Sequence, residues 1–342
     1  MAMSSYEVVR RAIEFDCPDR LPLRFASMGI NDTHGVKWNQ IGVGDVTQRE
    51  TLDEWGCTWV RSEVANMGQV KGHPLLDWNA LAHYRWPDGN APAFYEGMEE
   101  RFAGSEGKYV ITGIFMLLFE RMHALHGFEN TLIDLRLQRR EMEKLADRIV
   151  EFNLAIMENT AQRFPGQIHG FNFSDDWGTE LATFISPAFW NDFFKPRYKR
   201  IFAVAHSYGW HVWMHSCGKI NAIIEPLIEI GLDLLNLQQP RVLGIEEVGR
   251  QFRGRIAFDS VCDIQHTLPF KDADEIREEA RLLLTHWGTP AGGLILGDYG
   301  DGTAIGVGMD KKQIMLEAFL AADAEMRSQS VTTLTPLRYA SG

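Results

Sequence analysis

Residues 211–237 read HVWMHSCGKINAIIEPLIEIGLDLLNL, and this segment gives the clearest indication of the fold class. An apolar run at 211–216 has the composition of a buried strand, and a helical run follows it and stops at Gly231. A second apolar run follows at 232–237. A strand, a helix and a strand in this order form a parallel βαβ unit. The same alternation continues almost from end to end of the chain, which predicts a parallel sheet covered by helices.

Eight short apolar runs of the β type alternate with helical stretches. They are LPLRF at 21–25, GCTWV at 56–60, YVITGI at 109–114, IHGFNF at 168–173, HVWMHS at 211–216, LDLLNL at 232–237, RIAFDS at 255–260 and GLILG at 293–297. Eight such runs in 342 residues predict a closed (β/α)8 barrel of the TIM type, formed by one domain over residues 1–342. An open doubly wound sheet is the alternative, but no G-x-G-x-x-G motif follows the first strand.

Two features between the strands have readable boundaries. The helical stretch at 186–209 begins with Ser186 as its N-cap and Pro187 in the first helical position. Pro196 is expected to kink or divide this helix. The section at 61–107 is richer in glycine, proline and tryptophan, and we predict an excursion from the barrel that forms a hairpin and a lid.

The composition limits the class of protein. The net charge of −12 argues against binding to nucleic acid, which generally needs a basic face. No apolar run approaches the ~20 residues of a membrane helix, and the start of the chain lacks the apolar core of a signal peptide. A cytoplasmic protein is therefore expected. The four cysteines, Cys17, Cys57, Cys217 and Cys262, form no disulfide framework and are expected to be reduced thiols.

Polar or metal-binding side chains follow nearly every predicted strand. They lie at 31–32, 174–180, 214–218, 237–240, 259–263 and 297–302. Active sites of (β/α)8 barrels are built from the carboxyl ends of the strands. The sequence therefore predicts that the active site lies among these segments.

His215 and Cys217 stand two positions apart at a strand end, so their side chains point to the same side. Imidazole and thiolate both bind zinc, and a catalytic zinc ion has three protein ligands and one open position. Alternatively, the histidine bonds a backbone carbonyl and the cysteine packs as a small apolar residue. Four side chains at other strand ends could supply the third ligand: Cys262 and Asp298 first, then Glu180 and Asp176.

Two further strand ends carry acidic residues. Asp175 and Asp176 face opposite ways if the strand persists, so one of them could act as a general acid or base or orient a substrate. The alternative is a capping residue next to a solvated charge. The segment GDYGDG at 297–302 could bind a cation or hold a ligand through Tyr299, although Gly-Asp pairs are also ordinary turn residues.

Four segments resemble the uroporphyrinogen decarboxylase superfamily, and more closely its branch of zinc-dependent, corrinoid-linked methyltransferases. They are DDWGTELATFISPAFWNDFFKPRYKRIF at 175–202, HSCGKINAIIEPLIEIGLDLLNLQQP at 215–240, CDIQHTLP at 262–269 and GGLILGDYGDG at 292–302. The resemblance implies a (β/α)8 barrel. The decarboxylase itself has an arginine-rich signature after the first strand, and here only Arg24 precedes that loop. Uroporphyrinogen decarboxylase activity is therefore not expected.

The resemblance also implies a zinc site and a reaction. The methyltransferases have a His-x-Cys motif on the fifth strand, which His215 and Cys217 match, and a further cysteine near the end of the eighth. That cysteine is missing here, so Asp298 or Cys262 would replace it. The implied reaction moves a methyl group from a small O-methylated substrate, or an N- or S-methylated one, to the corrinoid (cobalamin) of a separate protein, with Zn²⁺ as Lewis acid. Among these reactions, demethylation of a methyl ether is the one we prefer.

The resemblance assigns roles to further residues. Asp176, or Asp263 on the seventh strand, would position the substrate or manage its proton. Asn172, Trp177 and Tyr299 would line the pocket. A homodimer is what the family suggests. Two other functions stay open: a metal-free decarboxylase of a polycarboxylate, which predicts a basic pocket, and a non-catalytic binding protein on the same fold.

Overall fold

The computed structural model describes residues 2–40, 48–61 and 68–333, with side chains described as far as residue 329. The fold is the predicted α/β fold of the TIM-barrel type, in which mainly parallel strands alternate with helices. The chain divides into two compact units. Unit 1 comprises Met1–Thr33 and Asn236–Gly342, and unit 2 comprises His34–Leu235. No helix in the described part of the chain is long and apolar enough to cross a membrane.

Unit 1 contains the first and the last strands of the main sheet. β1 pairs in parallel with β12, and β12 pairs in parallel with β11. The strands are β1 (Leu23–Phe25), β2 (Ile30–Asn31), β10 (Leu234–Leu237), β11 (Ala257–Ser260) and β12 (Leu294–Gly297). The helices are α1 (Ser5–Glu14), α8 (Pro240–Leu243), α9 (Ile245–Phe252), α10 (Thr267–Phe270), α11 (Ala273–Trp287) and α12 (Met309–Thr333), with short 3-10 turns η1 (Ala26–Met28) and η5 (Gly302–Ile305).

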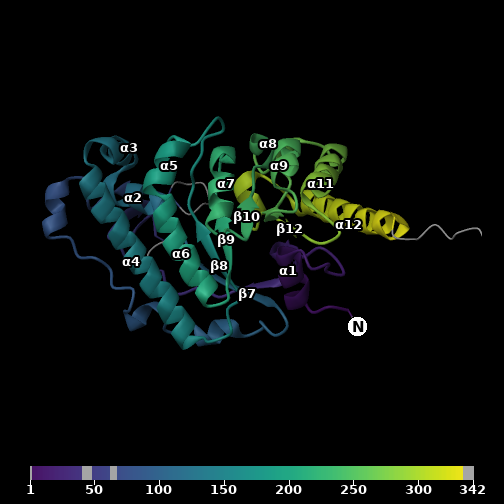
Figure 1. Cartoon of the computed structure of the whole chain (residues 1–342), viewed down its shortest axis with the longest axis horizontal. Coiled ribbons are helices and arrows are strands. Elements are labelled where there is room, and N and C mark those ends of the chain that lie inside the picture. Colours follow the sequence, from purple (N-terminus) through teal and green to yellow (C-terminus); the bar gives the residue numbers. More distant parts are fainter. Residues whose placement is uncertain (1, 41–47, 62–67, 334–342) are drawn as a thin grey trace, which may run out of the picture. The chain divides into compact units, whose positions relative to one another are not determined.

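Unit 2 contains the strands at one end of the strand order of the main sheet, where β7, β8 and β9 pair in parallel (Figure 1). The strands of this sheet are β3 (Thr33–Gly35), β7 (Tyr109–Ile114), β8 (Gly170–Ser174) and β9 (His211–His215). The helices are α2 (Phe119–His126), α3 (Phe128–Leu137), α4 (Arg139–Arg163), α5 (Pro187–Phe193), α6 (Lys195–Ser207) and α7 (Asn221–Glu229). Three 3-10 turns, η2 (Trp78–Ala82), η3 (Pro92–Phe94) and η4 (Glu99–Phe102), lie between β6 and β7.

The two faces of β8 and β9 have different surroundings. Phe173 is fully buried, and its ring stacks 5.8 Å, centroid to centroid, from that of Phe202 on α6. Asn172 lies on the opposite face of β8, because side chains alternate along a strand. The register pairs Asn172 with Trp213 and Ser174 with His215. This face points away from α6, as expected for the interior of a barrel.

One of the eight predicted barrel strands is wrong. The run at 56–60 contributes β5 (Thr58–Val60), the middle strand of a separate antiparallel sheet with β4 (Glu50–Leu52) and β6 (Gln69–Gly72). In its place β3 lies beside β7, and the Val36 N–H donates to the Ile111 carbonyl at 2.8 Å. Strand composition does not reveal which neighbour a strand pairs with, and a short apolar run has the same appearance in both sheets.

The predicted helix boundaries at 186–209 are confirmed. The Ser186 hydroxyl accepts the Phe189 N–H at 3.2 Å, and Pro187 occupies the first turn of α5. The helix divides at Phe194, between α5 and α6. Pro196 lies in the first turn of α6, where its missing N–H costs no helical hydrogen bond.

The excursion packs along α4. Asn159 donates to the Asn90 side chain at 2.9 Å, and the Arg163 guanidinium lies 4.6 Å from the centre of the Tyr95 ring. Further on, the ring of Phe102 lies 5.0 Å from that of Phe164. The hairpin and the lid stay predictions: β6 lies within residues 61–107, but its partner β5 lies before them, and residues 86–102 lie along α4. Residues 62–67, within the predicted excursion and lid, lie outside the described residues.

Candidate metal centre

Three metal-binding side chains meet at the carboxyl ends of β8 and β9. An oxygen of Asp176, a ring nitrogen of His215 and the sulfur of Cys217 all lie within 4.8 Å of one another. The His215 Nε2 lies 3.7 Å from the Asp176 Oδ1 and 3.4 Å from the Cys217 Sγ. Within the part of the chain that the structure describes, this is the one such group. All three side chains are half-buried, so an ion there would remain accessible to a small molecule.

Backbone hydrogen bonds hold the two strand ends in this position. The Asp175 N–H donates to the His215 carbonyl at 3.1 Å, which extends the β8–β9 pairing by one step. The Cys217 N–H donates to the Asp176 Oδ1 at 2.7 Å. The carboxylate of Asp176 is therefore fixed against the backbone that carries the other two side chains.

Two glycines allow the segments after these strands to touch. Gly218 has a φ of 81°, and a Cβ atom there would lie 2.2 Å from the Gly178 carbonyl oxygen. Only glycine has both the conformational freedom and the space for this approach. Gly218 is therefore required for the position of the neighbouring metal-binding residue, Cys217.

Asp175 and Asp176 face opposite ways. Asp175 is fully buried, and its carboxylate accepts the backbone N–H groups of Leu118, Phe119 and Glu120 at 3.1, 2.8 and 2.7 Å. It also accepts the Tyr198 hydroxyl. Burial raises the pKa of the Asp175 carboxyl to about 6, although these hydrogen bonds act in the opposite direction. Asp175 therefore caps the N-terminus of α2, while Asp176 faces His215 and Cys217.

Glu120, in the first turn of α2, belongs to the same surroundings, and sequence reasoning missed it. The side chain is buried, and its Oε2 has no hydrogen-bond partner. Burial, together with the negative charges of Asp176 and Asp175, raises the pKa of the Glu120 carboxyl well above its usual value. Acidic residues are common in the first turn of a helix, where they interact favourably with the helix dipole. The sequence therefore contained no specific signal that Glu120 belongs to the site.

The Cys217 thiol is held in its protonated form by its environment. Burial raises the pKa of the Cys217 thiol, and the neighbouring Asp176 carboxylate raises it further. A bound divalent cation reverses this effect, because it stabilises the thiolate directly. The donor set of one carboxylate, one imidazole and one thiolate matches the ligand types that zinc accepts.

The other predicted third ligands have partners elsewhere. Cys262 is fully buried in unit 1, and its thiol donates to the Ile276 carbonyl at 3.7 Å. Asp298, also in unit 1, pairs with the Lys312 ammonium group at 3.2 Å and accepts the Ser27 hydroxyl. Glu180 is exposed. The group of metal-binding side chains includes none of these three residues.

The remaining predicted site residues have different environments. Asp263 is fully buried in unit 1, and its carboxylate accepts backbone N–H groups, among them that of His266 at 2.8 Å. Trp177 is fully buried, and its ring stacks 4.5 Å from that of Phe119. Asn172 is half-buried on the interior face of β8. Tyr299 is half-buried in unit 1, and its carbonyl accepts from Lys312 at 2.7 Å.

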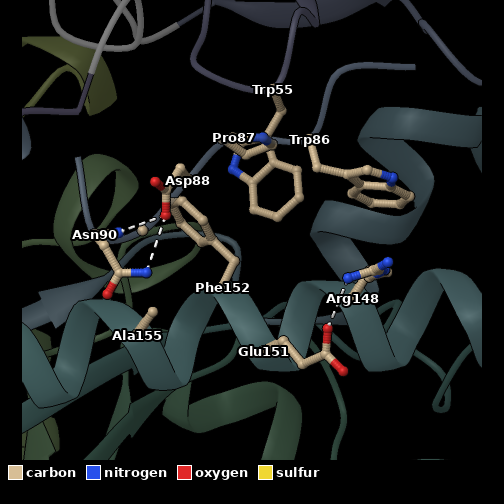
Figure 2. Close-up of a pocket in the computed structure, with 10 residues that line it drawn as sticks. Trp55, Trp86, Pro87, Asp88, Asn90, Arg148, Glu151, Phe152 and Ala155 are labelled. Carbon is tan, nitrogen blue, oxygen red and sulfur yellow. Dashed lines mark hydrogen bonds and ion pairs between the residues drawn. The ribbon is translucent and has the colours of Figure 1, made fainter. Parts of the chain in front are cut away.

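A pocket with a volume of about 230 Å³ lies between the excursion and α4, and none of the predicted site residues lines it (Figure 2). The Arg148 side chain pairs with Glu151 at 3.2 Å, and Asp88 accepts from the backbone and side chain of Asn90. The pocket is lined by Trp55, Trp86, Pro87, Asp88, Gly89, Asn90, Arg148, Glu151, Phe152 and Ala155.

The family model of uroporphyrinogen decarboxylase (URO-D) matches residues 106–319, and the chain belongs to this family. The predicted resemblance is thus confirmed. Among solved structures, a methyltransferase from Methanosarcina mazei is similar over 93% of this chain and 99% of its own, with 14% identity and a TM-score of 0.68. D-psicose 3-epimerase in the presence of D-fructose covers 69% of this chain and 84% of its own, with 12% identity and a TM-score of 0.38. None of the curated proteins matches the sequence.

Proposed function

We propose that this protein is a zinc-dependent methyltransferase that moves a methyl group from a small O-methylated substrate, or an N- or S-methylated one, to the corrinoid of a separate protein. Membership of the URO-D family and the fold shared with a protein named a methyltransferase support this proposal. The observation that carries it is the group formed by Asp176, His215 and Cys217. The homodimer stays a prediction.

Asp176 is the third zinc ligand in this proposal, in place of Cys262 or Asp298. Ligand atoms at about 2.0–2.3 Å from one tetrahedral zinc ion lie roughly 3–4 Å apart. The distances of 3.7 Å and 3.4 Å from the His215 Nε2 to Asp176 and Cys217 fall in this range. Zinc in this position would supply a Lewis acid with one open coordination site, suited to an ether oxygen.

The chain itself would bind and orient the substrate beside this centre. Asn172 lies on the interior face of β8, two residues before Ser174, which pairs with His215. Its amide can both donate and accept hydrogen bonds, so it would orient a polar group of the substrate. Trp177 would act indirectly, since it directly follows Asp176 in the chain and its buried ring stacks on that of Phe119. Asp263 and Tyr299 stay predicted positioning residues.

The charge of the site opposes the decarboxylase alternative. A decarboxylase acting on a polycarboxylate needs cationic groups to bind its substrate. The metal-free site instead presents the Asp176 carboxylate, which would repel the carboxylates of such a substrate. The ligand set thus favours the methyltransferase over the decarboxylase of the same family.

Metal analysis of the purified protein tests the proposal. We expect about one zinc ion per chain in the wild type and loss of zinc in Asp176→Asn, His215→Ala and Cys217→Ser, because each removes one of three ligands. Cys262→Ser and Glu180→Gln are the controls and should keep the metal. Methyl transfer from aryl methyl ethers to reduced free cobalamin should follow zinc content across the series. A wild type that binds no zinc, or zinc retained in Cys217→Ser, contradicts the proposal.

A further inference from the structure

The carboxyl group of Glu120 has an unusual environment. The side chain is 9% exposed, and Oε2 is buried without a hydrogen-bond partner. Buried carboxyl oxygens in folded proteins nearly always have a partner, because an unpaired one costs about 1–3 kcal/mol or more. Glu120 Oε2 is one of nine such side-chain atoms among the described residues, and its place next to a candidate metal centre indicates that a ligand supplies the missing partner.

Glu120 is connected to the segment that carries Asp176. Its carboxyl accepts a hydrogen bond from the Asp176 backbone N–H. In return, the Asp175 carboxylate accepts the Glu120 N–H at 2.7 Å. Hydrogen bonds thus run in both directions between the first turn of α2 and the segment at the end of β8.

Within the described residues, His215 is the one basic group at ion-pair distance from these acidic side chains, and it is itself a candidate metal ligand. Among the ion pairs of the described residues, none links Glu120, Asp175 or Asp176 to a lysine or arginine. The next residue, Arg121, is fully buried and pairs with Asp53 at 2.7 Å. Glu120 and Asp175 are both buried, and desolvation and mutual repulsion both oppose negative charge on such neighbouring acids. A divalent cation is the ligand chemistry that balances them.

We propose that Glu120 is a fourth residue of this metal centre: a positioning residue that fixes Asp176 through its backbone and whose Oε2 accepts a hydrogen bond from water bound to the metal. This inference rests on the proposed function, since it assigns a role at the same site. Such groups around a metal commonly change its affinity 10- to 100-fold. Glu120 therefore determines how tightly the centre holds a divalent metal.

The test is the zinc affinity of Glu120→Gln, measured by competition with a chromogenic chelator. Glutamine keeps the size of the side chain and can still accept the Asp176 N–H, but it removes the acidic oxygen. We expect zinc to bind about 10- to 100-fold more weakly. The Tm of the metal-free protein should stay the same or rise, because a buried acid is removed. Cobalt bound in place of zinc should keep its thiolate charge-transfer band, since Cys217 remains a ligand.

Glu129→Gln is the matched control, because Glu129 is an exposed acid in the first turn of the next helix, α3. Its zinc affinity should equal that of the wild type. Glu120→Ala is a second variant, in case Gln does not fold, and should also lose affinity. Wild-type affinity in either folded Glu120 variant overturns the inference and leaves the proposed function intact. A wild type that binds no metal overturns both.

Discussion

Asp175 and Asp176 share a peptide bond but have opposite environments. Four donors surround the buried Asp175 carboxylate, three of them backbone N–H groups at the start of α2. Asp176 instead faces His215 and Cys217. Strand alternation predicted that only one of the two would face the site. Alternation alone could not show which one, because the three backbone donors to Asp175 lie 55–57 residues earlier in the chain.

The two aspartates should therefore respond differently to the same substitution. Asp175→Asn replaces an oxygen with an NH₂ group that cannot accept from the α2 backbone, and we expect a loss of about 3 kcal/mol in the free energy of unfolding. Asp176→Asn should change stability by less than about 1 kcal/mol but abolish zinc binding. Urea unfolding in metal-free buffer and metal analysis measure the two effects. A larger stability loss in Asp176→Asn would contradict these roles.

Asp32 also follows a predicted strand but has a structural role. Its carboxylate accepts from Arg20 at 2.6 and 2.7 Å, from the Ser5 hydroxyl at 2.6 Å and from the Leu23 N–H at 2.7 Å. Burial alone would raise the pKa of the Asp32 carboxyl, but these hydrogen bonds outweigh it and hold the pKa below its usual value. The ionised form is thus more stable in the folded protein than in the unfolded one.

The sign of this shift gives a pH prediction. Because the pKa of Asp32 is lower in the folded protein, its carboxylate stabilises the fold fully above pH ~4, which is the pKa in the unfolded chain. This stabilisation is lost as the pH falls through the lower pKa of the folded protein. Asp32→Asn should lower the free energy of unfolding by about 2 kcal/mol at pH 7 and by much less near pH 2. Urea titrations across this range measure the difference. An equal loss at both pH values would mean that the ion pair is not its source.

At the scale of the elements, the candidate metal centre depends on how closely the segments after β8 and β9 approach each other. Gly218→Ala places a Cβ atom against the Gly178 backbone, at a φ that favours glycine. We expect at least a 10-fold loss of zinc affinity, because Cys217 must move. Gly209→Ala is the control: its φ of 74° is similar, but nothing lies within 4 Å of the added atom. That variant should lose about 1 kcal/mol of stability and keep its zinc. Equal zinc affinity in both variants would refute this argument.

The sequence predicted most elements and two of the three side chains of the candidate metal centre. Strand composition and alternation were enough for seven of the eight runs and for the side that His215 and Cys217 share. The third ligand was sought first at the seventh and eighth strands, following the family pattern, and Asp176 was placed behind Cys262 and Asp298. Consecutive parallel strands usually pair, so the end of β8 lies beside that of β9. Neighbouring strands were thus the stronger guide to Asp176. Glu120 could not be predicted, because it comes from a helix.

At the scale of the whole molecule, the proposed metal centre belongs to one unit. Asp176, His215, Cys217 and Glu120 all lie within unit 2, whereas Cys262 and Asp298 lie in unit 1. A bound ligand stabilises the region of the protein that must unfold before the ligand can leave. Metal binding should therefore protect unit 2 against local opening.

Hydrogen exchange with and without zinc tests this difference between the units. At a free zinc concentration 100 times Kd, binding adds about 2.7 kcal/mol, which slows exchange about 100-fold for amides that open only when the metal leaves. We expect this protection in α2, β8 and β9, all within unit 2. Exchange in β11 and β12 of unit 1 should change much less, because their local opening releases no metal. Cys217→Ser should show no protection in either unit. Equal slowing in both would mean that the units open together, and slowing confined to unit 1 would place the metal at Cys262 or Asp298.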